Sequence, residues 1–161
     1  MVHTPSLEAA KFWPGDMSKI ANHSVVIARL VVKGKDYGPQ SFIVPIRDPV
    51  TKAQAKGVEM GDVGSKYGYN NKDNAYAIFT SCRVPRSALL ARYISVSREG
   101  TVTTQGNLKI GYFAMMFIRI YIIQEASFFL AKPLAIALRY SAYRKQFKTS
   151  PDGTERIILD Y

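Results

Sequence analysis

The spacing of hydrophobic and polar positions changes about two thirds of the way along the chain. Beyond Gly106, large apolar side chains recur every three or four residues and charged side chains recur every seven, which is typical of an α-helix. The pattern predicts one long, mostly buried helix over about residues 108–147, with Asn107 as its N-cap. The apolar positions are Phe113, Met116, Phe117, Ile120 and Ile123, and the charged ones are Glu125, Lys132 and Arg139.

The predicted helix contains a proline and is interrupted by charges. Pro133 removes a backbone donor and clashes one turn back, so we expect either a kink or a division into two helices. Charged residues cut the apolar stretch 110–138 into runs far shorter than the roughly 20 apolar residues of a membrane span, and no transmembrane segment is expected. A helix this apolar needs partner helices, which the chain does not itself supply.

The chain before Gly106 has no helical period and shows short β-rich runs separated by turn residues. The continuous apolar run 24–32 predicts a strand covered on both faces, and 34–38 predicts a loop. Strands followed by a helix favour an α+β fold: an antiparallel, barrel-like or sandwich domain over 1–105, then an incomplete helical bundle over 106–161. The predicted strands are 24–32, 41–46, 57–63, 75–84, 93–97 and 101–104.

Composition excludes several classes of protein. With 161 residues, 47% hydrophobic and 21% charged, the chain has the make-up of one globular protein and not of a disordered, collagen-like or coiled-coil one. Its single cysteine, Cys82, cannot form an internal disulfide and is expected to be a small buried hydrophobe. The net charge of +10 suits anionic partners: nucleic acid, an anionic membrane surface or a phosphate-rich cofactor.

Most local motifs for chemistry are missing. Two histidines and one cysteine give no zinc-type spacing, so no metal site is expected. No dinucleotide-binding or Walker-type glycine loop occurs, and the glycine-rich 57–64 favours a strand and turn. Basic and aromatic residues gather at 139–147, as in nucleic-acid binders, but cations are favoured at any helix C-terminus, and nucleic acid is an unlikely partner.

A series of short segments nevertheless resembles one family in the right order along the whole chain. Together they are similar to the peroxisomal acyl-CoA oxidases, flavoenzymes of the acyl-CoA dehydrogenase superfamily. The segments are His3–Ser6, Lys11–Gly15, Gly34–Gly38, Phe42–Arg47, Gly61–Asn70, Asp73–Asn74, Arg83–Arg86, Arg139–Ala142, Arg144–Phe147 and Ile158–Tyr161.

The resemblance implies a fold and an activity. Residues 1–105 would be the middle β domain of such an oxidase, and 106–161 the start of its C-terminal helical domain. Such enzymes bind FAD, oxidise fatty acyl-CoA to trans-2-enoyl-CoA, reduce oxygen to hydrogen peroxide, lie in the peroxisome and dimerise with FAD between subunits. Their catalytic base comes from a later segment, so no carboxylate of this chain is expected to be catalytic.

Six residues match the family's cofactor-binding positions. Trp13, Gly15 and Asp16 fall where the β domain approaches the flavin ring, and glycine allows close backbone contact there. At the position of the family's second glycine this chain has Asp16. Its carboxylate would repel a reduced, anionic flavin or block the approach of the flavin. The second group, whose arginine suits phosphate, would reach the FAD of the other subunit. It comprises Arg144, Gln146 and Phe147.

Two functions therefore stay open. The chain is either a fragment or truncated form of an acyl-CoA oxidase, or a catalytically inactive structural subunit that has kept the oxidase β domain inside a larger assembly. Asp16, Pro133 and Lys148 depart from the family pattern and favour the second.

Overall fold

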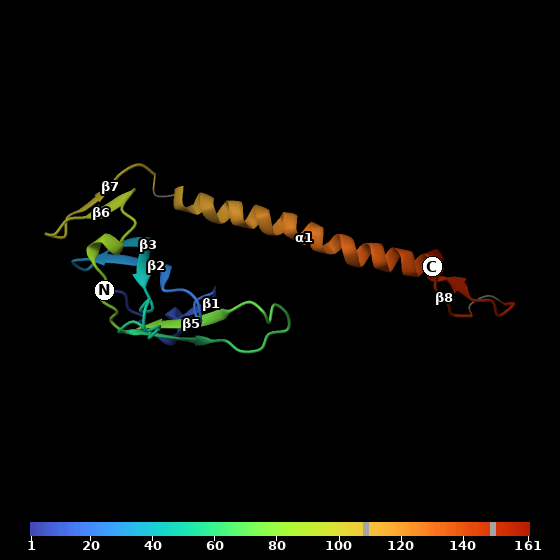
Figure 1. The fold of residues 1–161 in the computed structure, drawn as a ribbon. Helices are drawn as coiled ribbons and strands as arrows, with labels where there is room; N and C mark the ends of the chain where they lie inside the picture. Colours follow the sequence, from blue (N-terminus) through green and yellow to red (C-terminus); the bar gives the residue numbers. More distant parts are fainter. Residues whose placement is uncertain (108–109, 149–150) are drawn as a thin grey trace. The chain divides into compact units, whose positions relative to one another are not determined.

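The fold comes from a computed structural model that describes residues 1–107, 110–148 and 151–161. The chain divides into two compact units, Met1–Leu108 and Lys109–Tyr161, called here the β unit and the helical unit (Figure 1). Strands precede one long helix along the sequence, so the predicted α+β class is confirmed.

A three-stranded antiparallel sheet forms one part of the β unit. Its order is β1-β5-β4, so the buried strand β5 is paired on both sides. Strand β1 was not among the predicted strands, because its residues include a proline and a glycine. The bounds are Lys11–Gly15 for β1, Val58–Asp62 for β4 and Asn74–Phe79 for β5.

A long hairpin and a short one complete the described strands of the β unit. The long hairpin joins β2 (His23–Val32) to β3 (Lys35–Pro45), and the short one joins β6 (Ile94–Val96) to β7 (Val102–Thr104). The sheets stay separate in the described chain, so a closed barrel is not formed. The β unit also has two single 3-10 turns: Leu7–Ala9 precedes β1, and Arg86–Ala88 lies between β5 and β6.

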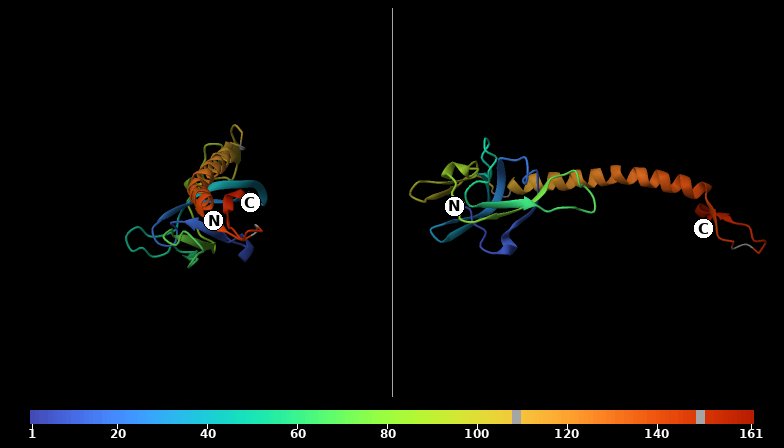
Figure 2. Two further views of the ribbon diagram at one scale, coloured as in Figure 1. Left: turned by 90° about the vertical axis from the view of Figure 1, so that its right-hand side faces the viewer. Right: turned by 60° about the horizontal axis from the view of Figure 1, so that its bottom comes forward.

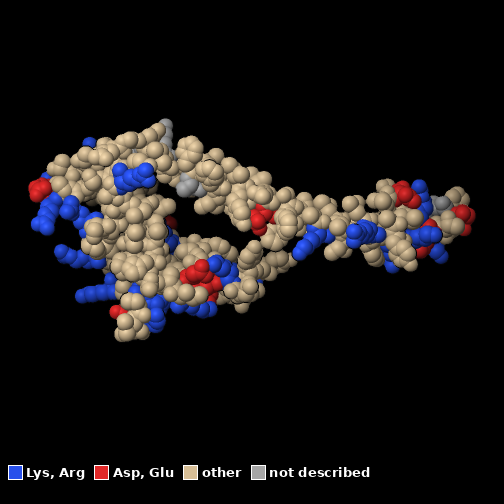
Figure 3. Space-filling model, turned by 45° about the horizontal axis from the view of Figure 1, so that its top comes forward, with Lys and Arg blue, Asp and Glu red and all other residues tan. Residues whose placement is uncertain are grey.

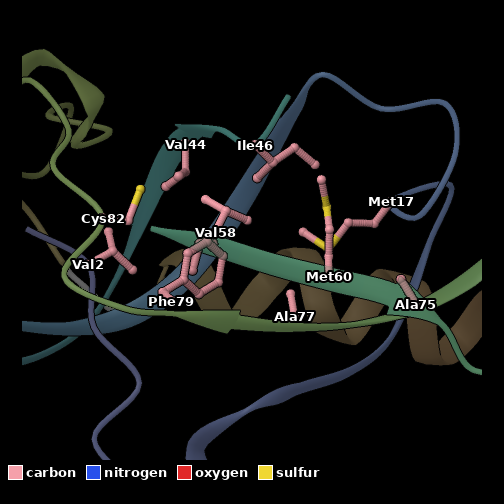
Figure 4. Close-up of a cluster of buried hydrophobic side chains, with 11 residues drawn as sticks. Val2, Met17, Val44, Ile46, Val58, Met60, Ala75, Ala77, Phe79 and Cys82 are labelled. Atoms are coloured by element: carbon pink, nitrogen blue, oxygen red, sulfur yellow. The ribbon is translucent and has the colours of Figure 1, made fainter. Parts of the chain in front are cut away.

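Apolar side chains from the two larger sheets meet in one core. Phe79 and Met60 of the three-stranded sheet point toward Val44 of the long hairpin and Ile46 directly after it (Figure 4). Cys82 is 3% exposed beside them, as predicted, and burial raises the pKa of its thiol. Burial of such side chains is the main force that holds the β unit together.

Two predictions about the long hairpin are wrong. Strand β2 is not covered on both faces, because Val26 is buried while Val25 and Ile27 are more than half exposed. The predicted loop 34–38 is mostly strand: the hairpin turns at Lys33 and Gly34, both with positive φ, as in a two-residue type I′ turn.

The helical unit is built on α1 (Ile110–Tyr143). The predicted start near residue 108 lies outside the described residues. One helix continues through Pro133, so the division into two helices is wrong. Beyond the helix, β8 (Lys145–Gln146) pairs with β9 (Arg156–Ile157), followed by a 3-10 turn, Ile158–Asp160 (Figure 2).

The prediction that α1 is mostly buried is also wrong for this chain. Phe113 is 66% exposed and Ile123 is 72% exposed, and the surface of the helix carries few charges (Figure 3). By length and composition α1 is able to cross a membrane, which is weak evidence because core helices of soluble proteins pass the same test. The apolar pattern predicts that partners are needed, not that this chain contains them.

Candidate functional site

The first group of predicted site residues lies on a β-bulge of β1. Phe12 pairs with Tyr76 and Gly15 pairs with Asn74, so β1 has one more residue than β5 between these pairs. The extra residue gives Trp13 a left-handed backbone, with φ +76°, and leaves its side chain 50% exposed. The bulge therefore brings an indole ring to the surface beside Gly15.

Gly15 is exposed at the end of the bulge, next to the side chain of Lys72. A Cβ atom added there would lie 3.0 Å from Cε of Lys72, so this flexible side chain would have to shift slightly. Glycine at this point keeps the backbone accessible, which is what close approach of a planar ligand requires.

Asp16 is paired with a lysine. Nζ of Lys72 lies 2.6 Å from Oδ2 of Asp16, and both side chains are about half exposed. The ion pair offsets the negative charge of Asp16, which the family resemblance would place near a flavin. Lys72, which is 56 positions away along the chain, therefore reduces the repulsion that was expected between this carboxylate and a reduced flavin.

A polar cleft of about 490 Å³ adjoins Asp16. Nζ of Lys66 donates to the carbonyl oxygen of Lys72 at 2.8 Å and lies 5.9 Å from the centre of the Trp13 ring. Cation and ring attract each other at this distance. The cleft, called here the Asp16 cleft, is lined by Asp16, Lys19, Ile20, Asp62, Gly64, Ser65, Lys66, Asn70, Asn71, Lys72 and Asp73.

A second ion pair in the Asp16 cleft shifts two pKa values. Nζ of Lys19 lies 2.7 Å from Oδ2 of Asp62. This contact and the amide of Gly64 hold the pKa of Asp62 below its usual 3.8, and the same carboxylate raises the pKa of Lys19 above 10.5.

We expect Asp62→Asn to reduce the fall in melting temperature of the full chain between about pH 5 and about pH 2. A lowered pKa in the folded state contributes stability that is present above the usual pKa of 3.8 and is lost as the pH falls through the lower folded value. Lys19→Met removes the main cause of the shift and should act in the same direction. Melting curves by circular dichroism check this, and identical acid limbs in all three proteins would contradict it.

The second group of predicted residues follows the C-terminus of α1. The backbone amide of Arg144 still donates to the carbonyl of Tyr140 at 2.8 Å, so Arg144 ends the helical hydrogen bonding. Its side chain is exposed, and in the described part of the chain no carboxylate pairs with it. An unpaired arginine at this place is available to an anionic ligand.

Tyr161 fixes the two residues that come next. Its hydroxyl lies 2.9 Å from the carbonyl oxygen of Gln146 and 3.2 Å from that of Phe147, to which it donates. Its ring meets Phe147 edge-on, with 6.2 Å between ring centres. The backbone of Phe147 has a left-handed conformation, with φ +65°, and the residue is 61% exposed.

The predicted site residues thus form two groups, one in each unit. Trp13, Gly15 and Asp16 are neighbours on the bulge of the β unit, and the Arg144 group is gathered by the β8–β9 hairpin. The roles of Lys72 and Tyr161 were not predicted, since no local motif links a residue to a partner far along the chain. Within the described residues, no group of three or more metal-ligating side chains occurs.

Comparison with known proteins places the chain in a family. The family model for the acyl-CoA oxidase C-alpha1 domain matches residues 112–161. Peroxisomal acyl-coenzyme A oxidase 1 of Homo sapiens is 39% identical over all 161 residues of the chain. The solved structure of acyl-CoA oxidase 1 from Arabidopsis thaliana matches 99% of the chain with a TM-score of 0.86 and 39% identity. The chain belongs to the acyl-CoA oxidase family.

This acyl-CoA oxidase chain spans about a quarter of its relatives, 24% of the human protein and 25% of the Arabidopsis structure. A second solved structure, acyl-CoA oxidase-2 of Caenorhabditis elegans, was determined with FAD, ascaroside-CoA and ATP. It matches 99% of the chain, at 42% identity and a TM-score of 0.83, and the chain covers 24% of it. The family predicted from the sequence is therefore confirmed.

Proposed function

We propose that this chain supplies the middle β domain, residues 1–105, and the start of the C-terminal helical domain, residues 106–161, of a peroxisomal, FAD-dependent acyl-CoA oxidase. The proposed reaction converts fatty acyl-CoA and oxygen to trans-2-enoyl-CoA and hydrogen peroxide. The proposed assembly is a homodimer, or a complex with other chains, that covers the exposed surface of α1. The observation that carries the proposal is the exposed backbone of Gly15 at the end of the β1 bulge.

The residues present fit FAD at two places. Gly15 would let the flavin ring approach the backbone, with the indole of Trp13 beside it, while Lys72 offsets the charge of Asp16. When bound, FAD would accept the hydride from the acyl chain and pass electrons to oxygen. Within this chain, the residues serve to bind and orient the cofactor, and no side chain is assigned to proton abstraction.

The Arg144 group suits the phosphate part of the cofactor. A guanidinium group binds phosphate oxygens through two parallel hydrogen bonds, and Arg144 is exposed for this. Gln146 and Phe147 are held next to it by Tyr161. These contacts would fall on the FAD of the other subunit in the proposed homodimer.

A chimera tests the proposal with a complete enzyme. Residues 1–161 replace the matched quarter of the Arabidopsis acyl-CoA oxidase 1, and the purified protein is analysed for size, bound flavin and peroxide release from palmitoyl-CoA. We expect the host's oligomeric state, flavin at about one per subunit, and peroxide production.

The inactive-subunit function is the second candidate, and Asp16 at the flavin position is the observation that favours it. The same chimera decides between the two. A protein with the host's size and a cooperative melting transition, but without flavin, would contradict cofactor binding by this chain and support a structural role.

A further inference from the structure

We propose that Asp73 and Asn74 are positioning residues, which hold residues 13–19 in the shape that meets the cofactor. The inference rests on the proposed function and names the side chains that set the geometry of its flavin-facing segment. The two residues are adjacent at the start of β5 and act on opposite sides of Gly15.

Asn74 holds the segment before Gly15. Its side-chain amide donates to the carbonyl oxygen of Trp13 at 3.1 Å, and the residue is only 5% exposed. It is the one buried polar residue among those that the structure describes. Burying a side-chain amide costs free energy unless the amide is hydrogen-bonded. The bond from Asn74 to Trp13 therefore fixes the bulge of β1 to strand β5.

Asp73 holds the segment after Gly15 through three hydrogen bonds. Its carbonyl oxygen accepts from the backbone amide of Asp16 at 2.8 Å. Its carboxylate accepts from the hydroxyl of Ser18 and, at 2.9 Å, from the backbone amide of Lys19. The turn that carries Asp16 is therefore tied to the same strand as the bulge.

Arg47 closes this turn from another direction. Its guanidinium donates to the carbonyl oxygen of Ser18 at 2.6 Å and to that of Lys52 at 2.9 Å. The turn is thus held between the strand start at 73–74 and the end of the long hairpin.

The backbone of the segment needs such restraints. Trp13 and Asp16 both have positive φ, at +76° and +61°, a conformation that residues other than glycine rarely adopt. Without outside hydrogen bonds each residue would return to ordinary backbone angles, and the open surface at Gly15 would change shape. The side chain of Asn74 bonds to Trp13 itself, while Asp73 bonds to Asp16 through its backbone carbonyl and to Ser18 and Lys19 through its carboxylate. Loss of either side chain is therefore expected to loosen the segment and to affect cofactor binding as well as stability.

The test uses Asn74→Ser, which shortens the donor, and Asp73→Asn, which keeps the size of the side chain but removes one acceptor. Asp36→Asn is the matched control, since the Asp36 carboxylate also accepts from a backbone amide, that of Gly38, within strand β3 of the long hairpin. All three are made in the Arabidopsis chimera and in the full chain of 161 residues.

We expect each positioning variant to weaken FAD binding by the chimera roughly tenfold or more, while the control binds as the unaltered chimera does. Trp13 is the sole tryptophan of the chain, and its fluorescence anisotropy in the full chain should fall in both variants under conditions in which circular dichroism shows them folded. If Asn74→Ser fails to fold, FAD binding and Trp13 anisotropy of Asp73→Asn still test the inference.

Unchanged FAD affinity and unchanged Trp13 anisotropy in both variants would overturn the inference. Failure of the proposed function has a different signature, because the unaltered chimera would then hold no flavin. In that case a fall in Trp13 anisotropy would still show that Asp73 and Asn74 set the shape of this segment.

Discussion

Phe79→Ala is expected to lower the free energy of unfolding of the β unit by about 3–5 kcal/mol. Phe79 is 1% exposed and pairs with Val58 across β5 and β4, so truncation leaves a cavity in the centre of the core. Its backbone is also tied to the N-terminal segment, because the amide of Thr4 donates to its carbonyl at 2.7 Å. A domain is usually stable by about 5–15 kcal/mol, so the loss is a large fraction of the total.

Urea unfolding of the full chain, followed by the fluorescence of Trp13, measures this effect in the β unit alone. Tyr67→Ala is the matched control, because Tyr67 is an aromatic residue with a fully exposed side chain. Its unfolding free energy should change by less than about 0.5 kcal/mol. Equal losses in the two variants would show that the packing around Phe79 is not what stabilises the unit.

Local patterns predicted the helices and strands whose hydrophobic spacing is visible within their own residues. The three- and four-residue spacing from Phe113 to Ile123 is enough to predict α1, and the turn-bounded runs predict most strands. Strand β1 lacks such a pattern, since Trp13 and Pro14 lie on a bulge whose geometry comes from pairing with β5. Pairing between distant segments is not visible in a single sequence.

Burial of α1 could not be predicted for a related reason. Apolar residues around the helix indicate that its surface must be covered, but they do not indicate by which chain. In the described chain Phe113 and Ile123 are exposed. The chain spans about a quarter of the length of its relatives, so most of each relative lies outside the stretch that it matches.

The candidate site was predicted through resemblance more than through physics. Gly15 and Arg144 match family segments, and the structure adds that both are exposed. The roles of Lys72, Asn74 and Tyr161 could not be predicted, because each acts through a contact made by folding. The Asp16–Lys72 pair matters most, because Lys72 offsets a negative charge that has no visible partner in the sequence.

Arg144→Ala is expected to weaken FAD binding by the chimera roughly 10- to 100-fold, because it removes hydrogen bonds between a charged donor and phosphate. Arg144→Lys keeps the charge but cannot form two parallel bonds, so its affinity should lie between those of the alanine variant and the unaltered chimera. Flavin fluorescence during equilibrium dialysis measures the three dissociation constants.

Lys145→Ala provides the matched control for charge at the end of α1. Lys145 is the next residue, is exposed and lies in β8, but it is outside the proposed contacts. If the alanine variants at 144 and 145 weaken FAD binding equally, the effect comes from the general positive charge of this surface. A loss confined to Arg144, with lysine intermediate, requires directed hydrogen bonds, which only a guanidinium held at that position supplies.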